Sequence, residues 1–124
     1  MKELTKAEEQ VMQNLWKLGK GFVKDVVELF DDPKPAYNTV STIIRILEKK
    51  GFVSYKAYGN TYEYFPVVSK EEYTQKTMKK FVGNYFGNSF QSMFSYFSKN
   101  ENLSLKELEE LKAIIEKEIN SKKK

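Results

Sequence analysis

The spacing of apolar residues changes from a helical to a strand period just after Gly51, and this change constrains the fold more than any other feature. Before Gly51, apolar residues recur at helical spacing in three short stretches. After it, β-branched and aromatic residues fill Phe52–Ala57 and Thr61–Val67 on either side of Tyr58-Gly59-Asn60, a pattern typical of a β-hairpin. Three short helices and then a hairpin predict a winged helix-turn-helix over residues 1–68.

Capping and stop residues delimit the three predicted helices. Thr5 and Glu8 form a capping box at the start of the first helix, which ends at Gly19. The third helix is expected from about Tyr37 to Lys50. The apolar stripes of the three helices predict the core of this domain, and they consist of Ala7, Val11, Leu15, Leu18, Val23, Val26, Val27, Phe30, Val40, Ile43, Ile44 and Leu47.

Helical patterns return after the hairpin. Two further capping boxes, Ser69–Glu72 and Ser104–Glu107, predict helices, and Gly83 and Gly87 are expected to bend or break the first of these. The chain is thus expected to be mainly α-helical with one small hairpin, and residues 69–124 to form a helical second domain. Such a small domain buries little surface alone, so we expect a homodimer with Phe86, Phe90, Phe94, Leu108, Leu111 and Ile115 at its interface.

The chain contains neither cysteine nor histidine. Disulfides, zinc fingers, iron–sulfur sites, thiol nucleophiles and Ser-His-Asp triads are therefore excluded, and we expect no enzyme, no metal site and no cofactor. The N-terminus lacks the apolar segment of a secretory signal, and the uncharged stretch Phe81–Ser98 is too rich in polar residues for hydrocarbon. We therefore expect a cytoplasmic protein without membrane insertion.

The third predicted helix carries the clearest indication of function. Opposite its apolar stripe lie small polar side chains and Arg45, the only arginine of the chain, and these residue types reach base edges and phosphates. Residues 36–60 also hold four cations against one carboxylate, most of the net charge of +4. We therefore expect this helix and the hairpin tip to contact double-stranded DNA through Asn38, Thr39, Ser41, Thr42, Arg45, Lys56, Tyr58 and Asn60.

The same fold fits a second function, a winged-helix protein-interaction module without a DNA target. An exposed aromatic surface on the third helix would favour the interaction module, whereas asparagine, serine, threonine and arginine favour DNA. A polar, solvated helix face is the simplest interpretation for an arbitrary helix. The position of this helix immediately before a hairpin favours the DNA-binding interpretation.

Three stretches carry a family likeness: LTKAEEQVMQNLW at the start, NTVSTIIRILEKKGFV in the third helix and its exit, and FSKNENLSLKELEELK near the end. Together they resemble the BlaI/MecI/CopY family of penicillinase and methicillin-resistance repressors. Trp16 matches the family's tryptophan in the first helix, and Thr39–Thr42 matches its T-hydrophobic-x-T helix. The resemblance implies a dimeric transcriptional repressor that uses Asn38, Thr39, Ser41 and Thr42 on a palindromic operator.

Departures from the family pattern limit what the resemblance implies. Ser41 stands where the best-known members carry arginine, so their operator sequence does not transfer to this chain. The copper-sensing branch uses cysteines, which this chain lacks. In the β-lactam-responsive branch, a pathway with a membrane sensor metalloprotease ends in cleavage of an Asn–Phe bond. The matching position here is Tyr96-Phe97, which keeps the phenylalanine but not the asparagine. This bond is therefore the candidate cleavage site, and the alternative is that the two residues form a buried aromatic pair.

Overall fold

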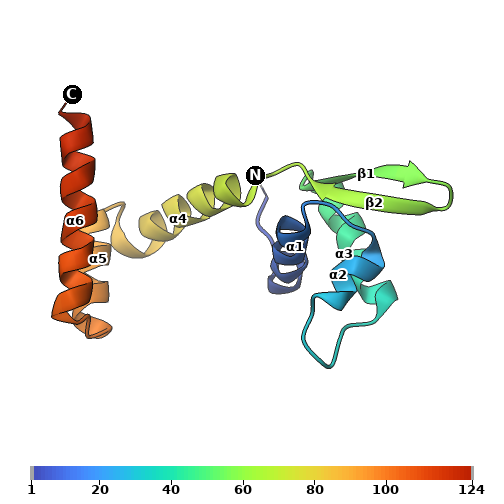
Figure 1. Cartoon of the computed structure of the whole chain (residues 1–124), viewed down its shortest axis with the longest axis horizontal. Coiled ribbons are helices and arrows are strands. Elements are labelled where there is room, and N and C mark those ends of the chain that lie inside the picture. The colour runs from blue at the N-terminus through green and yellow to red at the C-terminus, as the bar shows by residue number, and fades with distance from the viewer. Residues whose placement is uncertain (1, 124) are drawn as a thin grey trace. The chain divides into compact units, whose positions relative to one another are not determined.

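The computed structural model describes residues 2–123 and contains, in that range, six helices and a two-stranded antiparallel hairpin (Figure 1). The predicted fold class, mainly α-helical with one small hairpin, is confirmed. The chain divides into two compact units, Met1–Lys76 and Thr77–Lys124, while the domain boundary after Val68 stays a prediction. None of the helices within residues 2–123 is long and apolar enough to span a lipid bilayer.

The first unit begins with three helices, α1 (Lys6–Leu18), α2 (Val23–Glu28) and α3 (Tyr37–Lys49). The predicted capping box starts α1: Thr5 Oγ1 accepts a hydrogen bond from the Glu8 N–H at 3.2 Å, and Glu8 Oε1 accepts one from the Thr5 N–H at 2.9 Å. These bonds satisfy N–H groups that a helix start leaves without partners.

Gly51 ends α3 and turns the chain toward the hairpin. Its φ of 84° lies in the left-handed region that favours glycine. The Gly51 N–H donates to the Glu48 carbonyl at 3.0 Å, and the Phe52 N–H donates to the Leu47 carbonyl at 2.9 Å. This pair of bonds is the Schellman motif, which satisfies carbonyls at the end of a helix.

The hairpin consists of β1 (Val53–Tyr58) and β2 (Thr61–Pro66). The sequence places Tyr58 in the turn, but the structure pairs it with Thr61 at the end of the ladder. Only two residues then remain in the turn, and the first of them, Gly59, has a φ of 61°, as type II′ hairpin turns require. We call this hairpin the wing.

The core of the first unit lies between the three helices and the base of the wing. It contains most of the predicted stripe positions together with side chains of both strands, whereas Ala7 is exposed. A backbone bridge between Gly21 and Tyr64, with hydrogen bonds of 2.9 and 2.8 Å, ties the wing to the loop before α2. The buried core residues are Val11, Met12, Leu15, Val23, Val26, Val40, Ile44, Leu47, Phe52, Val53 and Tyr64.

Helix α4 (Lys70–Phe86) follows the wing and runs through the division between the two units. The helix continues through Gly83, so the expected break there is wrong, and it ends just before Gly87, whose φ is 58°, so the expected break at Gly87 is confirmed. Packing explains why a glycine stands at position 83, because a Cβ there would lie 2.8 Å from Asn88 Oδ1. The glycine therefore makes room for the asparagine side chain after the helix.

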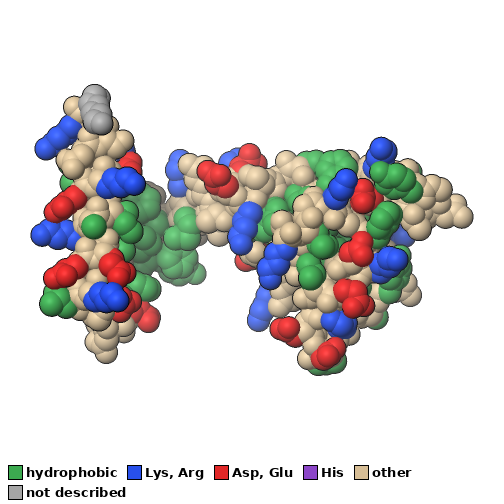
Figure 2. Space-filling view, viewed as in Figure 1, with side chains coloured by type: hydrophobic (Ala, Val, Ile, Leu, Met, Phe, Trp, Pro, Cys, Tyr) green, Lys and Arg blue, Asp and Glu red, His purple; other side chains and the backbone are tan. Residues whose placement is uncertain are grey.

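The second unit continues with α5 (Phe90–Asn100) and α6 (Leu105–Lys122). The predicted capping box at the start of α6 is present, with Ser104 and Glu107 each accepting from the other's backbone N–H. Val82 is the only buried side chain among residues 77–123. Figure 2 shows apolar side chains on the surface of this unit, and an apolar face of this kind is characteristic of an interaction surface.

Candidate nucleic-acid interface

Helix α3 places its polar residues on the side away from the core. Val40, Ile44 and Leu47 are buried, while most of the polar residues predicted to contact DNA are exposed. The Thr42 hydroxyl donates to the Asn38 carbonyl at 2.9 Å, which leaves the oxygen lone pairs and the methyl group of Thr42 for a partner. Asn38, Thr39, Thr42 and Arg45 are exposed, and Ser41 is half-buried.

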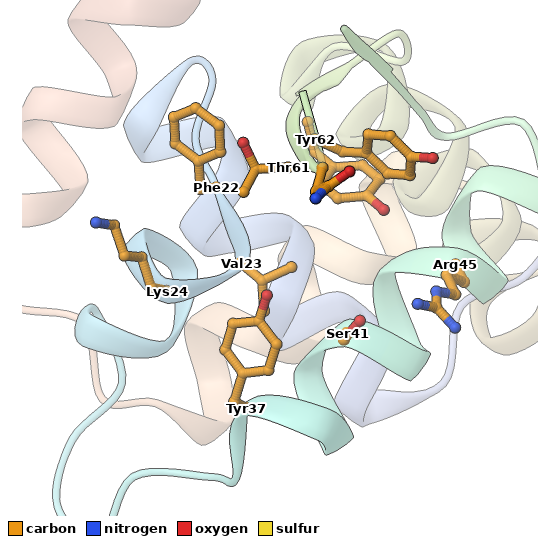
Figure 3. A pocket seen from close by; sticks show the side chains of 10 residues that line it. Phe22, Val23, Lys24, Tyr37, Ser41, Arg45, Thr61 and Tyr62 are labelled. Atoms are coloured by element: carbon orange, nitrogen blue, oxygen red, sulfur yellow. The ribbon is translucent and has the colours of Figure 1, made fainter. Parts of the chain in front are cut away.

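A groove of about 340 Å³ lies between α3, the start of α2 and the wing (Figure 3). We call it the wing groove. It brings together three of the predicted DNA-contacting residues, Ser41, Arg45 and Asn60, from two elements that are distant in sequence. It also includes residues that sequence reasoning missed, namely Phe22, Val23, Lys24, Tyr37, Thr61, Tyr62 and Tyr64.

The other predicted wing residues lie elsewhere. Tyr55 pairs with Tyr64, so these two side chains lie on the same face of the hairpin, and Tyr62 shares this face. Because successive residues of a strand point to opposite faces, Lys56 and Tyr58 lie on the other face. Lys56 Nζ lies 5.3 Å from the centroid of the Tyr58 ring, a cation–π contact. These two residues do not line the wing groove.

Three tyrosines cover the other face of the wing. The rings of Tyr55 and Tyr62 stack with centroids 4.3 Å apart, and the Tyr64 ring lies 5.7 Å from Tyr55 and 6.3 Å from Tyr62. The sequence indicates part of this cluster, because Tyr62 and Tyr64 are two residues apart on one strand and such residues share one face. What the alternation does not reveal is which face turns toward α3.

Tyr64 keeps its phenol neutral at physiological pH. Burial raises the pKa of Tyr64, and the nearby Glu48 carboxylate raises it further, while Arg45 acts in the opposite direction. Tyr64, a buried residue of the groove lining, therefore adds no charge to the groove. Arg45 is close enough to Tyr64 to act on it electrostatically, which places the guanidinium charge beside the wing.

Lys50 belongs to the cation-rich stretch 36–60, but its ammonium is engaged within the fold rather than free for a DNA partner. Its ammonium lies 2.6 Å from Glu8 Oε1 on α1, and it also donates to the Glu3 carbonyl at 3.2 Å. The positive charge counted for residues 36–60 is therefore partly compensated within the fold. Lys24 on α2 adds a cation on the wing-groove side that the sequence window does not include.

The residues predicted for the dimer interface are mostly uncovered in the single chain. Phe86 is half-buried and contacts the Phe81 and Tyr96 rings at centroid distances of 5.9 and 5.8 Å. Leu111 is half-buried, and Phe90, Phe94, Leu108 and Ile115 are exposed.

Tyr96 and Phe97, at the predicted cleavage bond, are exposed side chains of α5. No cluster of acidic side chains suited to a metal ion occurs within residues 2–123.

Three helices, a hairpin wing and an exposed polar face on the third helix define a winged helix-turn-helix protein. The family model of the penicillinase repressor matches residues 4–117. The chain therefore belongs to the penicillinase repressor family, as its resemblance to the BlaI/MecI repressors implies, and the members of this family are transcriptional repressors rather than enzymes.

Relatives of known function cover nearly the whole chain. The methicillin resistance regulatory protein MecI of Staphylococcus aureus strain N315 is 30% identical over 116 residues, which is 93% of this chain and 94% of MecI. The penicillinase repressor of Staphylococcus aureus is 33% identical over 116 residues, 91% of this chain and 90% of the relative. The penicillinase repressor of Bacillus licheniformis is 28% identical over 122 residues, 98% of this chain and 95% of the relative.

Proposed function

We propose that this protein is a homodimeric repressor that binds a palindromic operator, inserting α3 of each subunit into the major groove and placing each wing over the adjacent DNA backbone. The observation that carries the proposal is the exposed polar face of α3. Asn38, Thr39 and Thr42 lie on this face, opposite the buried stripe of the same helix. Small polar side chains of these types contact base edges without steric hindrance.

The uncovered apolar face of the second unit supports dimerisation. Phe90 is 59% exposed and Ile115 is 52% exposed in the single chain, although large apolar side chains are costly to leave in water. A two-fold dimer would cover these residues with their own copies. It would also supply the two α3 helices that a palindromic operator needs.

Cleavage of the Tyr96–Phe97 bond by a pathway with a membrane sensor metalloprotease is the mode of relief that we propose. The bond lies inside α5, so a protease would first have to unwind part of this helix. Because none of the side chains of α5 is buried, local opening there costs little compared with opening in the core of the first unit.

One observation favours the alternative, a protein-interaction module. Tyr37, at the start of α3, is 57% exposed, and an exposed aromatic residue on this helix is the feature expected of such a module. It is the only aromatic residue of α3, however, and a tyrosine hydroxyl also contacts DNA phosphates. We therefore favour DNA as the partner of α3.

Selection of DNA from a random duplex library by the full-length protein tests the proposal. We expect enrichment of a palindrome whose half-site centres are about 34 Å apart or a multiple of that distance. At physiological salt, the selected duplex should bind at least about 10³-fold more tightly than a random duplex of equal length. Equal binding of the two duplexes would refute DNA-sequence recognition and favour the interaction module.

A further inference from the structure

The wing groove has a lining that matches the backbone of DNA better than its bases. Its two cations are Lys24 from α2 and Arg45 from α3, and Figure 3 shows them at opposite sides of the view, with Tyr37, Ser41 and Thr61 between them. No carboxylate is among the lining residues. A groove with positive charge at its ends and hydroxyl groups between them suits a strand of alternating phosphates and sugars.

The polar groups of this lining are largely unused by the fold. Within residues 2–123, the side chains of Lys24, Tyr37, Ser41, Arg45 and Tyr62 make no hydrogen bond or ion pair with the rest of the chain. The hydroxyl of Thr61 is the exception, because it donates to the Tyr58 carbonyl at 2.9 Å. Cationic and hydroxyl donors that are exposed and unoccupied are available to an anionic partner.

Three acidic groups lie near the groove: Asp25 is engaged, Glu63 lies on the other face of the hairpin, and Glu48, whose charge acts on Tyr64, does not line the groove. Asp25 Oδ2 accepts the Phe22 N–H at 2.9 Å and so serves the start of α2. Glu63 pairs with Lys56 in the ladder, on the hairpin face opposite Tyr62. None of the three carboxylates lines the groove, so the charge presented there is positive.

We propose that the wing groove holds the sugar–phosphate backbone of one DNA strand, with Lys24 and Arg45 each bound to a phosphate. This inference rests on the proposed DNA binding and refines it, because it assigns the only arginine of α3 to positioning. Arg45 shares the groove with the wing residues Asn60 and Tyr62, whereas Asn38, Thr39 and Thr42 lie outside the groove. Base recognition then belongs to the asparagine and the two threonines.

The assignment predicts different behaviour for the two groups of residues. A phosphate contact is the same on every sequence, so its loss weakens operator and random DNA by one common factor and reduces the salt dependence of binding. A base contact exists only on the correct sequence, so its loss lowers affinity for the operator alone. The ratio of the two affinities therefore distinguishes the groups.

The test uses the full-length protein with the selected palindrome and a random duplex, titrated by fluorescence anisotropy at several salt concentrations. We expect Arg45→Ala and Lys24→Ala each to weaken binding to both duplexes about tenfold, and to reduce the slope of log affinity against log salt by about one. Lys6→Ala removes the same charge from an exposed position outside the groove, and it should change either affinity less than about twofold. Asn38→Ala should weaken the palindrome alone.

Two outcomes would overturn the inference while DNA binding stands. If Arg45→Ala weakens the palindrome and spares the random duplex, Arg45 contacts a base. If Lys24→Ala behaves like Lys6→Ala, the groove does not hold the strand. Failure of the unmodified protein to prefer any duplex would instead refute the proposed function itself. Circular dichroism of each variant establishes that it is folded, as expected for substitutions of exposed side chains without hydrogen bonds.

Discussion

The ammonium of Lys50 lies 2.6 Å from a carboxylate oxygen of Glu8 and joins the end of α3 to the start of α1. Glu8 is 5% exposed, and the same oxygen completes the capping box of α1 by accepting the Thr5 N–H. One carboxylate thus holds a helix start and the end of the proposed DNA-binding helix. The contact adds a polar link between α1 and α3 to the core packing of Val40, Ile44 and Leu47.

Replacing Lys50 by alanine should lower the free energy of unfolding by about 1–3 kcal/mol, because it leaves a buried carboxylate without its cation. Urea denaturation followed by circular dichroism measures this difference. Lys49→Ala is the matched control, since Lys49 is an exposed neighbour in the last turn of the same helix. Equal losses in the two variants would show that the contact with Glu8 adds nothing to stability.

The protonation of Glu8 should make stability depend on pH. Burial alone raises the pKa of Glu8, but the hydrogen bonds from Lys50 and from the Thr5 backbone outweigh it, so the pKa lies below its usual value of 4.5. The ionised carboxylate therefore stabilises the fold at pH values above 4.5, and this contribution is lost as the pH falls through the lower pKa of the folded state. Unfolding measured at a series of pH values should show a smaller acid loss in Glu8→Gln than in the unmodified protein.

Gly51→Ala should lower the stability of the first unit by about 1–2 kcal/mol through backbone strain alone. A Cβ at this position would have no atom within 4 Å, so no steric clash contributes, whereas the φ of 84° disfavours any side chain. Gly51→Asn should cost less, because asparagine tolerates this conformation better than alanine does. A thermal melt in which alanine is tolerated as well as asparagine would contradict this account.

The sequence predicts the elements of the first unit because each of them is specified locally. The capping box at Thr5, the stripe from Val40 to Leu47 and the stop at Gly51 all lie within a few residues of what they determine. The pairing of Lys50 with Glu8 joins residues 42 apart in the chain, and no local pattern indicates it. Gly83 fails as a predicted helix breaker for the same kind of reason, since its role is set by the Asn88 side chain.

The candidate site also has a part that local sequence predicts and a part that depends on packing between distant segments. The polar face of α3 follows from helical spacing, and the structure leaves Asn38, Thr39, Thr42 and Arg45 exposed. The wing groove could not be predicted, because it depends on which face of the hairpin turns toward α3. Tyr62 and Lys24 enter the candidate site only through that packing.

The proposed dimer should be sensitive to a charge at Leu111. This half-buried residue of α6 belongs to the predicted interface, and Leu111→Glu would place an unpaired carboxylate in apolar surroundings. We expect the dissociation constant of the dimer to rise at least about tenfold, as measured by sedimentation equilibrium. Ala113→Glu introduces the same residue at an exposed position of the same helix and should leave the dimer intact. A dimer unaffected by Leu111→Glu would remove this residue from the interface.

Cleavage between Tyr96 and Phe97 should release the operator without altering a DNA-contacting residue. The break separates Phe97 and all of α6 from the rest of the chain, and with them Leu108, Leu111 and Ile115 of the predicted interface. The core of the first unit lies entirely before residue 77, so each winged helix should stay folded.

A chain that ends at Tyr96 reproduces the product that keeps the DNA-binding unit. One winged helix makes half the contacts of the dimer, and two linked copies gain orders of magnitude in affinity through their effective concentration. We therefore expect the truncated chain to bind the selected palindrome at least about 100-fold more weakly than the full chain, while it binds a single half-site with the affinity of one subunit. Fluorescence anisotropy on both duplexes separates lost dimerisation from damage to α3, because damage would weaken the half-site as well. If the truncated chain binds the palindrome as tightly as the full chain, cleavage at this bond is not the switch, and relief of repression has to come from a ligand or a protein partner.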